Sequence, residues 1–445
     1  MSTENYDILI CIFDRLQNDR KTLFQCSLVS RAFSDAVSRV LYREVTFSPP
    51  FTRALDLRRK DEFSEGMLYS ASLPHHAQQV LRFELSGYPS ARPAPLNSLA
   101  SHLKTVIGLW SNLTTLVFAP KQYHEQLFIE ALPLLANCKF LRDLTVNASC
   151  MQETQAALLT RLEGLERVAL QNPTRAMLDL LPEWLSRLSP SLRGLHLQEN
   201  CGSITPGVLR SFLPHLGRVS AFTLGLSYSL ADSDVFAFLN ELQNLHTLDI
   251  RYYLQLRPPT TVPRLTQLRS LTVRYTSVST VDHAGYLCKW IRRAVAYAPL
   301  SKLHLACEEE NRGAAVRFDG LLAHLSQKHA TRLRELRMDT AFVGKDALRE
   351  LCMSCVKLQE IAIAVSANVL AELPEIFEPL DDLLTARIET RNAKRNRISL
   401  DVQGVSDFLH RGPPHLRRLA INGVYWERVS NADQQISFVV GKSDV

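Results

Sequence analysis

The chain contains the stretch Leu245-His-Thr-Leu248-Asp-Ile250, and the same pattern returns 23 residues later as Leu268-Arg-Ser-Leu271-Thr-Val273. Clear copies of this pattern, Leu-x-x-Leu-x-Leu/Val/Ile, start at Leu113, Leu141, Leu192, Leu245, Leu268, Leu300, Leu333, Leu358 and Leu416, and weaker ones at Val80, Leu165, Val219 and Leu383. The thirteen starts between residues 80 and 416 are spaced 28 residues apart on average. Alternating apolar residues within each copy indicate a short strand with one buried face.

The segments between the copies have helical spacing instead, as in 126–135, where Leu127, Ala131, Leu134 and Leu135 share one face. A unit of strand, turn, helix and turn, about 20–29 residues long, is typical of leucine-rich repeats. The pattern therefore predicts an α/β leucine-rich-repeat solenoid over residues 80–424, with a parallel concave sheet and outer helices. Individual periods vary from 23 to 33 residues, so the array is irregular. The alternative is an ordinary α/β domain whose strands happen to carry the same pattern.

Composition narrows the class of protein. Apolar residues make up 46% and charged residues 22% of the 445 positions, which is typical of a folded globular chain. The net charge of +6 is small for this length and does not indicate a nucleic-acid partner. Nine cysteines, an acidic polar start and the absence of a long apolar run argue against secretion and membrane insertion. We expect a cytoplasmic and/or nuclear protein.

The first 47 residues differ from the repeats and predict a module of three short helices. On a helix with 100° per residue, the apolar side chains cover a wider arc than packing against a single core needs. These residues are Ile8, Leu9, Ile12, Phe13 and Leu16. So small a module rarely buries enough surface by itself, so the extra arc predicts either an external partner or docking onto the repeats. Residues 48–79 are expected to be a connector, and residues 425–445 a C-terminal tail.

The module carries Asp7-Ile8-Leu9-x-x-Ile12-Phe13-x-x-Leu16, then Leu28-Val29-Ser30-Arg31-x-Phe33 and Leu41-Tyr42-Arg43-Glu44-Val45. This combination, over residues 4–47, resembles the F-box, in particular its fungal members. It departs from the family at Glu4-Asn5, where Leu-Pro is usual. The resemblance implies binding to a Skp1-like adaptor and through it a cullin. By the same resemblance, the following residues contribute to the adaptor contact or its supporting core, the alternative being internal packing alone: Ile8, Leu9, Ile12, Phe13, Leu16, Leu28 and Val29.

The repeats are then expected to recruit a protein substrate on the concave sheet face. The residues between the buried strand positions face that side, and the predicted substrate-binding set is Asp249, Arg251, Thr272, Arg274, His304 and Arg337. Arg251 and Arg274 hold equivalent positions in consecutive repeats, which places them about 4.8 Å apart on adjacent strands. Two like charges at this spacing repel each other unless negative groups lie beside them, so the pair favours binding of an acidic segment of the substrate. The alternative is that carboxylates of the chain itself, such as Asp249, neutralise the arginines in a solvated ladder of ion pairs.

We find no catalytic motif and expect no enzyme activity, cofactor or metal. The pair Cys352-Met-Ser-Cys355 lacks further metal ligands and is interpreted as small apolar residues at the end of a repeat helix. The sequence thus predicts the substrate-recognition subunit of an SCF-type (Skp1–cullin–F-box) ubiquitin ligase. The alternatives are a repeat scaffold that never joins a ligase and an enzyme with an unrecognised site on the repeat face.

Overall fold

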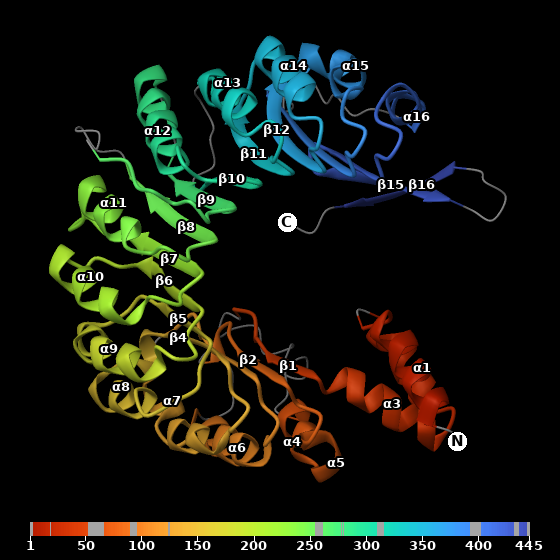
Figure 1. The fold of residues 1–445 in the computed structure, drawn as a ribbon. Coiled ribbons are helices and arrows are strands. Elements are labelled where there is room, and N and C mark those ends of the chain that lie inside the picture. The colour runs from red at the N-terminus through yellow and green to blue at the C-terminus, as the bar shows by residue number, and fades with distance from the viewer. Residues whose placement is uncertain are drawn as a thin grey trace. The chain divides into compact units, whose positions relative to one another are not determined.

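The computed structural model describes residues 3–17, 19–51, 66–89, 96–122, 125–253, 261–276, 278, 280–308, 316–391, 402–430 and 436–442. The chain divides into two compact units, Met1–Val219 and Ser220–Val445. Within each unit the repeat helices lie on one side of the strands (Figure 1).

Three helices open the first unit: α1 (Thr3–Asp14), α2 (Arg20–Ser27) and α3 (Arg31–Leu41). Asp19 caps α2, because its Oδ1 accepts a hydrogen bond from the Thr22 amide at 3.0 Å. Ser30 caps α3 in the same way through the Phe33 amide, at 3.3 Å. These side chains satisfy amide groups that the first turn of a helix leaves without partners. α3 packs against both α1 and α2, and the shared core is formed by Phe13, Leu23, Ala36, Val37 and Val40.

The first unit continues with parallel strands, each paired to the next along the chain: β1 (Glu44–Phe47), β2 (Arg82–Leu85), β3 (Thr115–Phe118), β4 (Asp143–Asn147), β5 (Arg167–Gln171) and β6 (Gly194–Asn200). The segments between and after them form α4 (Gly66–Ser72), α5 (Pro74–Ala77), α6 (Leu96–Leu109), α7 (Glu125–Phe128), α8 (Glu153–Leu159), α9 (Arg175–Leu188) and α10 (Pro206–Phe212). Short 3-10 turns supplement them: η3 (Leu132–Asn137), η4 (Ala148–Cys150) and η5 (Leu213–His215).

The second unit repeats the arrangement with β7 (Ala221–Leu226), β8 (Thr247–Tyr252), β9 (Ser270–Tyr275), β10 (Lys302–Cys307), β11 (Glu335–Phe342), β12 (Glu360–Ser366), β13 (Thr385–Arg391) and β14 (Arg418–Ile421), all parallel. Its helices are α11 (Asp232–Asn240), α12 (Val281–Ala294), α13 (Asp319–Lys328), α14 (Lys345–Ser354), η6 (Ala367–Glu372), α15 (Leu373–Phe377) and α16 (Val402–Arg411). The strands β15 (Val424–Ser430) and β16 (Ile436–Lys442) follow in antiparallel order.

The apolar pattern sets the register of the second unit. Leu248, Leu271, Leu303, Leu336 and Ile361 stand opposite one another on β8 to β12, and each is at most 1% exposed. Full burial of such a side chain contributes about 1.5–3 kcal/mol. A parallel strand pair needs a crossover, and helices supply it between most of these strands. Between β8 and β9, the described residues 261–269 form loop and turn only. The predicted α/β array of parallel strands and flanking helices, an LRR-like solenoid, is confirmed at this level.

The structure differs from two predicted boundaries. Strand β1 already belongs to the parallel sheet, and α4 and α5 occupy part of the expected connector 48–79, so the repeat architecture begins before residue 80. The first repeat was hidden because Tyr42 stands where the pattern has leucine. At the other end, the segment expected to be a tail joins β14 through a tight hairpin. Asn422 and Gly423 form its turn with φ values of 51° and 80°, as two-residue hairpins require.

Candidate functional site

The residues expected to contact an adaptor fall into two groups in the structure. Ile8, Ile12, Leu28 and Val29 are exposed to 57%, 49%, 68% and 67%. Phe13, by contrast, is 2% exposed, and its ring meets the Phe33 ring edge-on with centroids 5.5 Å apart. Leu9 and Leu16 are partly buried and pack against the same core. The first group is therefore free to contact another protein, whereas the second supports the helices.

Helix geometry explains this division. Ile8 and Ile12 lie four residues apart and so share one face of α1, while Phe13 points from a different face into the core. Phe24 and Leu28 have the same spacing along α2 and its C-cap, and Phe24 is 57% exposed. Phe24 was not among the predicted contact residues, although its spacing from Leu28 could have indicated it. We define Ile8, Ile12, Phe24, Leu28 and Val29 as the exposed apolar set.

The end of α1 is also tied to the chain that leads into the sheet. Arg43, which follows α3, forms an ion pair with Asp14, with Nη1 and Oδ1 2.9 Å apart. Both side chains are about one-third exposed. The pair connects the last residue of α1 to the residue immediately before β1, so it helps to hold α1 against the start of the repeats.

The predicted substrate residues come together on one sheet face of the second unit. Asp249, Thr272, His304 and Arg337 form a row across β8, β9, β10 and β11, because each stands opposite the next. Arg251 and Arg274 stand opposite each other in a parallel row. The 23-residue spacing of the two arginines thus predicted their register correctly.

Both arginines are met by carboxylates of the chain itself. Arg274 forms a two-pronged pair with Asp249, in which Nη2 and Oδ2 are 2.9 Å apart. Arg251 Nε lies 2.5 Å from Glu308 Oε2, in a geometry that makes an ion pair without a directed hydrogen bond. The face therefore carries the solvated ladder of ion pairs using Asp249, which was the alternative to an acidic substrate. Because each arginine already has a carboxylate partner, repulsion between the two arginines gives no reason to expect an acidic ligand. A substrate contact at this face stays a prediction.

The ladder extends along the same face. Arg337 pairs with Glu360, with Nε and Oε1 2.7 Å apart, and Lys302 pairs with Glu335. Arg274 and Arg337 are 48% and 45% exposed in their side chains, so water screens these pairs. Exposed ion pairs contribute about 0.2–1 kcal/mol each.

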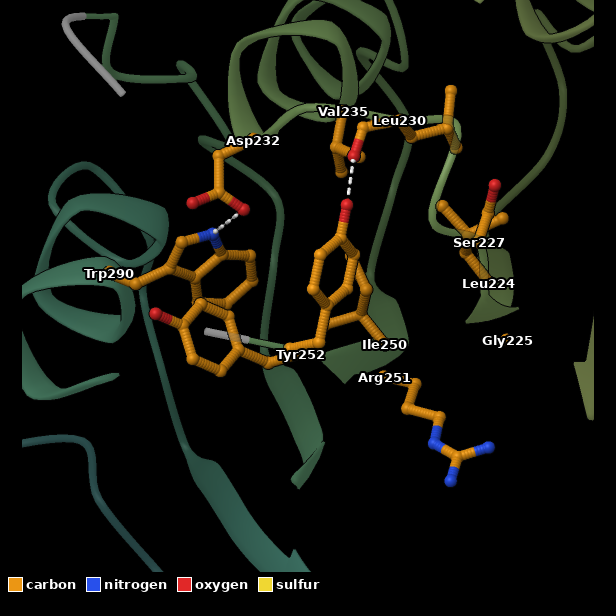
Figure 2. A pocket seen from close by; sticks show the side chains of 11 residues that line it. Leu224, Gly225, Ser227, Leu230, Asp232, Val235, Ile250, Arg251, Tyr252 and Trp290 are labelled. Atoms are coloured by element: carbon orange, nitrogen blue, oxygen red, sulfur yellow. Dashed lines mark hydrogen bonds between the residues drawn. The ribbon is translucent and has the colours of Figure 1, made fainter. Parts of the chain in front are cut away.

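A pocket of about 340 Å³, including solvent at its mouth, lies beside this face between β7, β8, α11 and α12 (Figure 2). Asp232 is 8% exposed there and accepts a hydrogen bond from Trp290 Nε1 at 3.1 Å. Tyr253 donates its hydroxyl to the Leu230 carbonyl at 2.8 Å. Burial raises the pKa of Asp232 to about 6, against the opposing effect of the Trp290 hydrogen bond. The described residues lining the pocket include no histidine, cysteine or lysine to act as a base or nucleophile beside Asp232.

The paired cysteines are buried at the end of α14. Burial raises the pKa of the Cys355 thiol to about 12 and that of Cys352 further, so both stay protonated and unreactive. Among the residues that the structure describes, no group of three or more His, Cys, Asp or Glu side chains could hold a metal ion. None of the described helices is both long and apolar enough to cross a membrane.

No protein-family model matches the chain, and no curated protein matches it. Among solved structures, the chain is similar to one in the crystal structure of the Rad7 and Elc1 complex in yeast, with a TM-score of 0.47 and 16% identity over 88% of this chain and 94% of that one. It is also similar to one in the TLR13–ssRNA13 complex, with a TM-score of 0.34 and 16% identity over 78% of this chain and 44% of that one. The fold assignment rests on the register of the chain's own strands.

Proposed function

We propose that this protein is the substrate-recognition subunit of an SCF-type ubiquitin ligase. Its N-terminal helices bind a Skp1-like adaptor, and its repeats hold a protein substrate. The observation that carries the proposal is the exposed apolar set on α1, on α2 and on the two residues after α2, in a module whose core has few side chains. The F-box resemblance of residues 4–47 names the partner class.

The magnitude of the exposed surface supports a binding role. Each member of the set is about half to two-thirds exposed, so covering it would contribute on the order of 1 kcal/mol. Such exposed apolar side chains, carried here by α1 and by α2 with the two residues after it, are of the kind that anchors protein interfaces. In this proposal the protein performs no bond chemistry and works in the cytoplasm or nucleus. It raises the local concentration of the substrate near a conjugating enzyme.

Capture of the adaptor tests the proposal. Full-length protein and the double variant Ile8→Asp/Ile12→Asp are used to recover a Skp1-like adaptor, and Phe140→Asp serves as the control. Phe140 is 53% exposed in the same unit, so it matches the chemical change outside the exposed apolar set. Phe13→Asp is unsuitable, because it would place a charge in the module core.

We expect the adaptor to bind wild type and Phe140→Asp, and to be lost from the double variant while the thermal unfolding temperature changes little. Failure of wild type to bind the adaptor refutes the adaptor role, and equal binding by the double variant refutes the proposed surface. Recovery of the adaptor without a cullin would favour a repeat scaffold outside a ligase.

Substrate capture by the charged face needs its own variant. Arg251→Glu/Arg274→Glu reverses two charges on that face. Arg411→Glu on α16 is the control, because Arg411, like Arg274, is an exposed arginine paired with a carboxylate. We expect the double variant to lose captured proteins that the control retains. If both variants capture the same set as wild type, the face does not recognise the substrate through these charges.

A further inference from the structure

The cavity between β7, β8, α11 and α12 combines a buried carboxylate with aromatic walls (Figure 2). Asp232, in the first turn of α11, lines the cavity and is buried. Trp290 from α12 and Tyr252 from β8 are buried beside it, with their ring centroids 5.6 Å apart. Because Trp290 Nε1 donates its 3.1 Å hydrogen bond to Asp232 Oδ1, the carboxylate directly adjoins this aromatic wall.

Two further tyrosines lead from the cavity to the surface. Tyr253, the residue after β8, lines the cavity, and its hydroxyl is held by the Leu230 carbonyl at 2.8 Å. Tyr228, two residues after β7, is 74% exposed, and its ring meets the Tyr253 ring edge-on with centroids 5.3 Å apart. A large aromatic side chain that stays so exposed beside a cavity is typical of a surface that another protein covers.

The charges around the cavity favour a cation. Among the described residues that line it, Asp232 and Arg251 are the only charged side chains. Arg251 forms an ion pair with Glu308, and Figure 2 shows that it extends away from Asp232. Next to Trp290 the charge is therefore negative at pH 7, because burial raises the pKa of Asp232 only to about 6. Aromatic rings also attract cations to their faces.

The size and the walls of the cavity select among cations. Its volume of about 340 Å³ includes solvent at the mouth and lies at the lower end of the roughly 300–1,000 Å³ of small-molecule sites, so it suits a single side chain. Leu224, Val235 and Ile250 add apolar surface for the methylene groups of a lysine, whose ammonium brings three donors. An arginine would bring five donors to a cavity with one carboxylate among its described lining residues.

We propose that this cavity binds a lysine side chain of a protein partner, with the ammonium group paired to Asp232 and the methylene groups packed against Trp290 and Tyr253. The surface of the partner around that lysine covers Tyr228. The inference does not depend on the proposed ligase role.

Binding of N-acetyl-lysine methylamide to the full-length protein tests the proposal, and N-acetyl-norleucine methylamide is the matched compound without the ammonium group. NMR of the indole N–H groups detects weak binding, because the Trp290 N–H is bonded to Asp232 and its signal should shift. Trp290→Phe identifies this signal among the four tryptophans. We expect the lysine compound to bind at pH 7 at least about tenfold more tightly than the norleucine compound. No binding of the lysine compound, or equal binding of both, overturns the proposal.

Asp232→Asn is the test variant, and Asp346→Asn, which removes an exposed acid from the first turn of α14, is the control. Asparagine keeps an oxygen that can accept from Trp290 but carries no charge, so we expect the variant to stay folded, and thermal unfolding checks this. Binding of the lysine compound should weaken at least about tenfold in Asp232→Asn and stay unchanged in the control. Unchanged binding in Asp232→Asn overturns the assignment of the ammonium group to this carboxylate.

The pH dependence gives a second readout. Since the pKa of Asp232 is about 6, roughly a tenth of the carboxylate is ionised at pH 5, so the affinity should fall about tenfold between pH 7 and pH 5. Arg251, Tyr252 and Tyr253, the other lining groups that can carry charge, do not titrate in this range. A constant affinity contradicts the proposal.

n-Butylamine distinguishes the source of the ammonium group. Binding of the lysine compound at least as tight as that of n-butylammonium supports a protein side chain. Tighter binding of n-butylammonium indicates a free amine and overturns the protein partner.

Discussion

Replacing Asp232 by asparagine is expected to stabilise the second unit above pH 6 and to change it little below pH 3.8. Asparagine keeps an oxygen that can accept the 3.1 Å hydrogen bond from Trp290 Nε1, but it cannot ionise. Burial raises the pKa of Asp232 from 3.8 to about 6. Because one pKa unit equals 1.36 kcal/mol, this difference corresponds to roughly 3 kcal/mol in the free energy of unfolding.

The sign follows from proton binding. Below pH 3.8 the carboxyl group is protonated in both the folded and the unfolded chain. Between pH 3.8 and about 6 the unfolded chain has released this proton while the folded chain keeps it, so the free energy of unfolding falls as the pH rises. Above pH 6 the loss is complete, and wild type should be less stable than Asp232→Asn by about 3 kcal/mol.

Thermal unfolding of wild type and variant across this pH range measures the effect. For a unit of this size, about 3 kcal/mol corresponds to a rise in Tm of roughly 6–12 °C above pH 6. Asp346→Asn is the control, because Asp346 is an exposed acid in the first turn of α14, as Asp232 is in the first turn of α11. A constant difference between wild type and Asp232→Asn at every pH would refute the reasoning, as would a variant that is less stable above pH 6.

Three further results are expected. His329→Gln should flatten the acid side of the stability profile. Burial lowers the pKa of His329 from 6.5 to about 4, so wild type loses stability in urea unfolding as the pH falls through that range. Gly423→Ala should cost about 1 kcal/mol, because φ is 80° there, and hydrogen exchange in β15 should speed up. Arg274→Ala should cost less than about 1 kcal/mol in urea unfolding, because its pair with Asp249 is solvent-exposed.

Several features of the fold were predictable because they depend on local periodicity. Leucines at 248, 271, 303 and 336 alternate with polar residues, which indicates strands, and the equal offsets of Arg251 and Arg274 in their repeats set their register. Strand β1 escaped detection because Tyr42 replaces the first leucine of the pattern. The final hairpin had a local signal in the sequence, because Asn422-Gly423 is typical of a two-residue β-turn. The repeat pattern does not include it.

The candidate sites were predictable only in part. The helical spacing of Ile8, Ile12 and Phe13 showed an apolar arc too wide for one core. The spacing alone does not predict that Phe13 lies in the core while Ile8 and Ile12 are exposed, because that depends on where α3 packs against α1.

The sequence by itself determined the repeat, the parallel order of its strands and the register of neighbouring side chains, because these follow from a period of two within strands and of 23–33 residues between them. Only the tertiary structure decided which charges meet. Arg251 pairs with Glu308 across 57 positions, and Asp232 bonds Trp290 across 58, because strand and helix packing bring together side chains that no periodicity connects. Coulomb attraction and desolvation act over a few ångströms in space, whatever the separation along the chain.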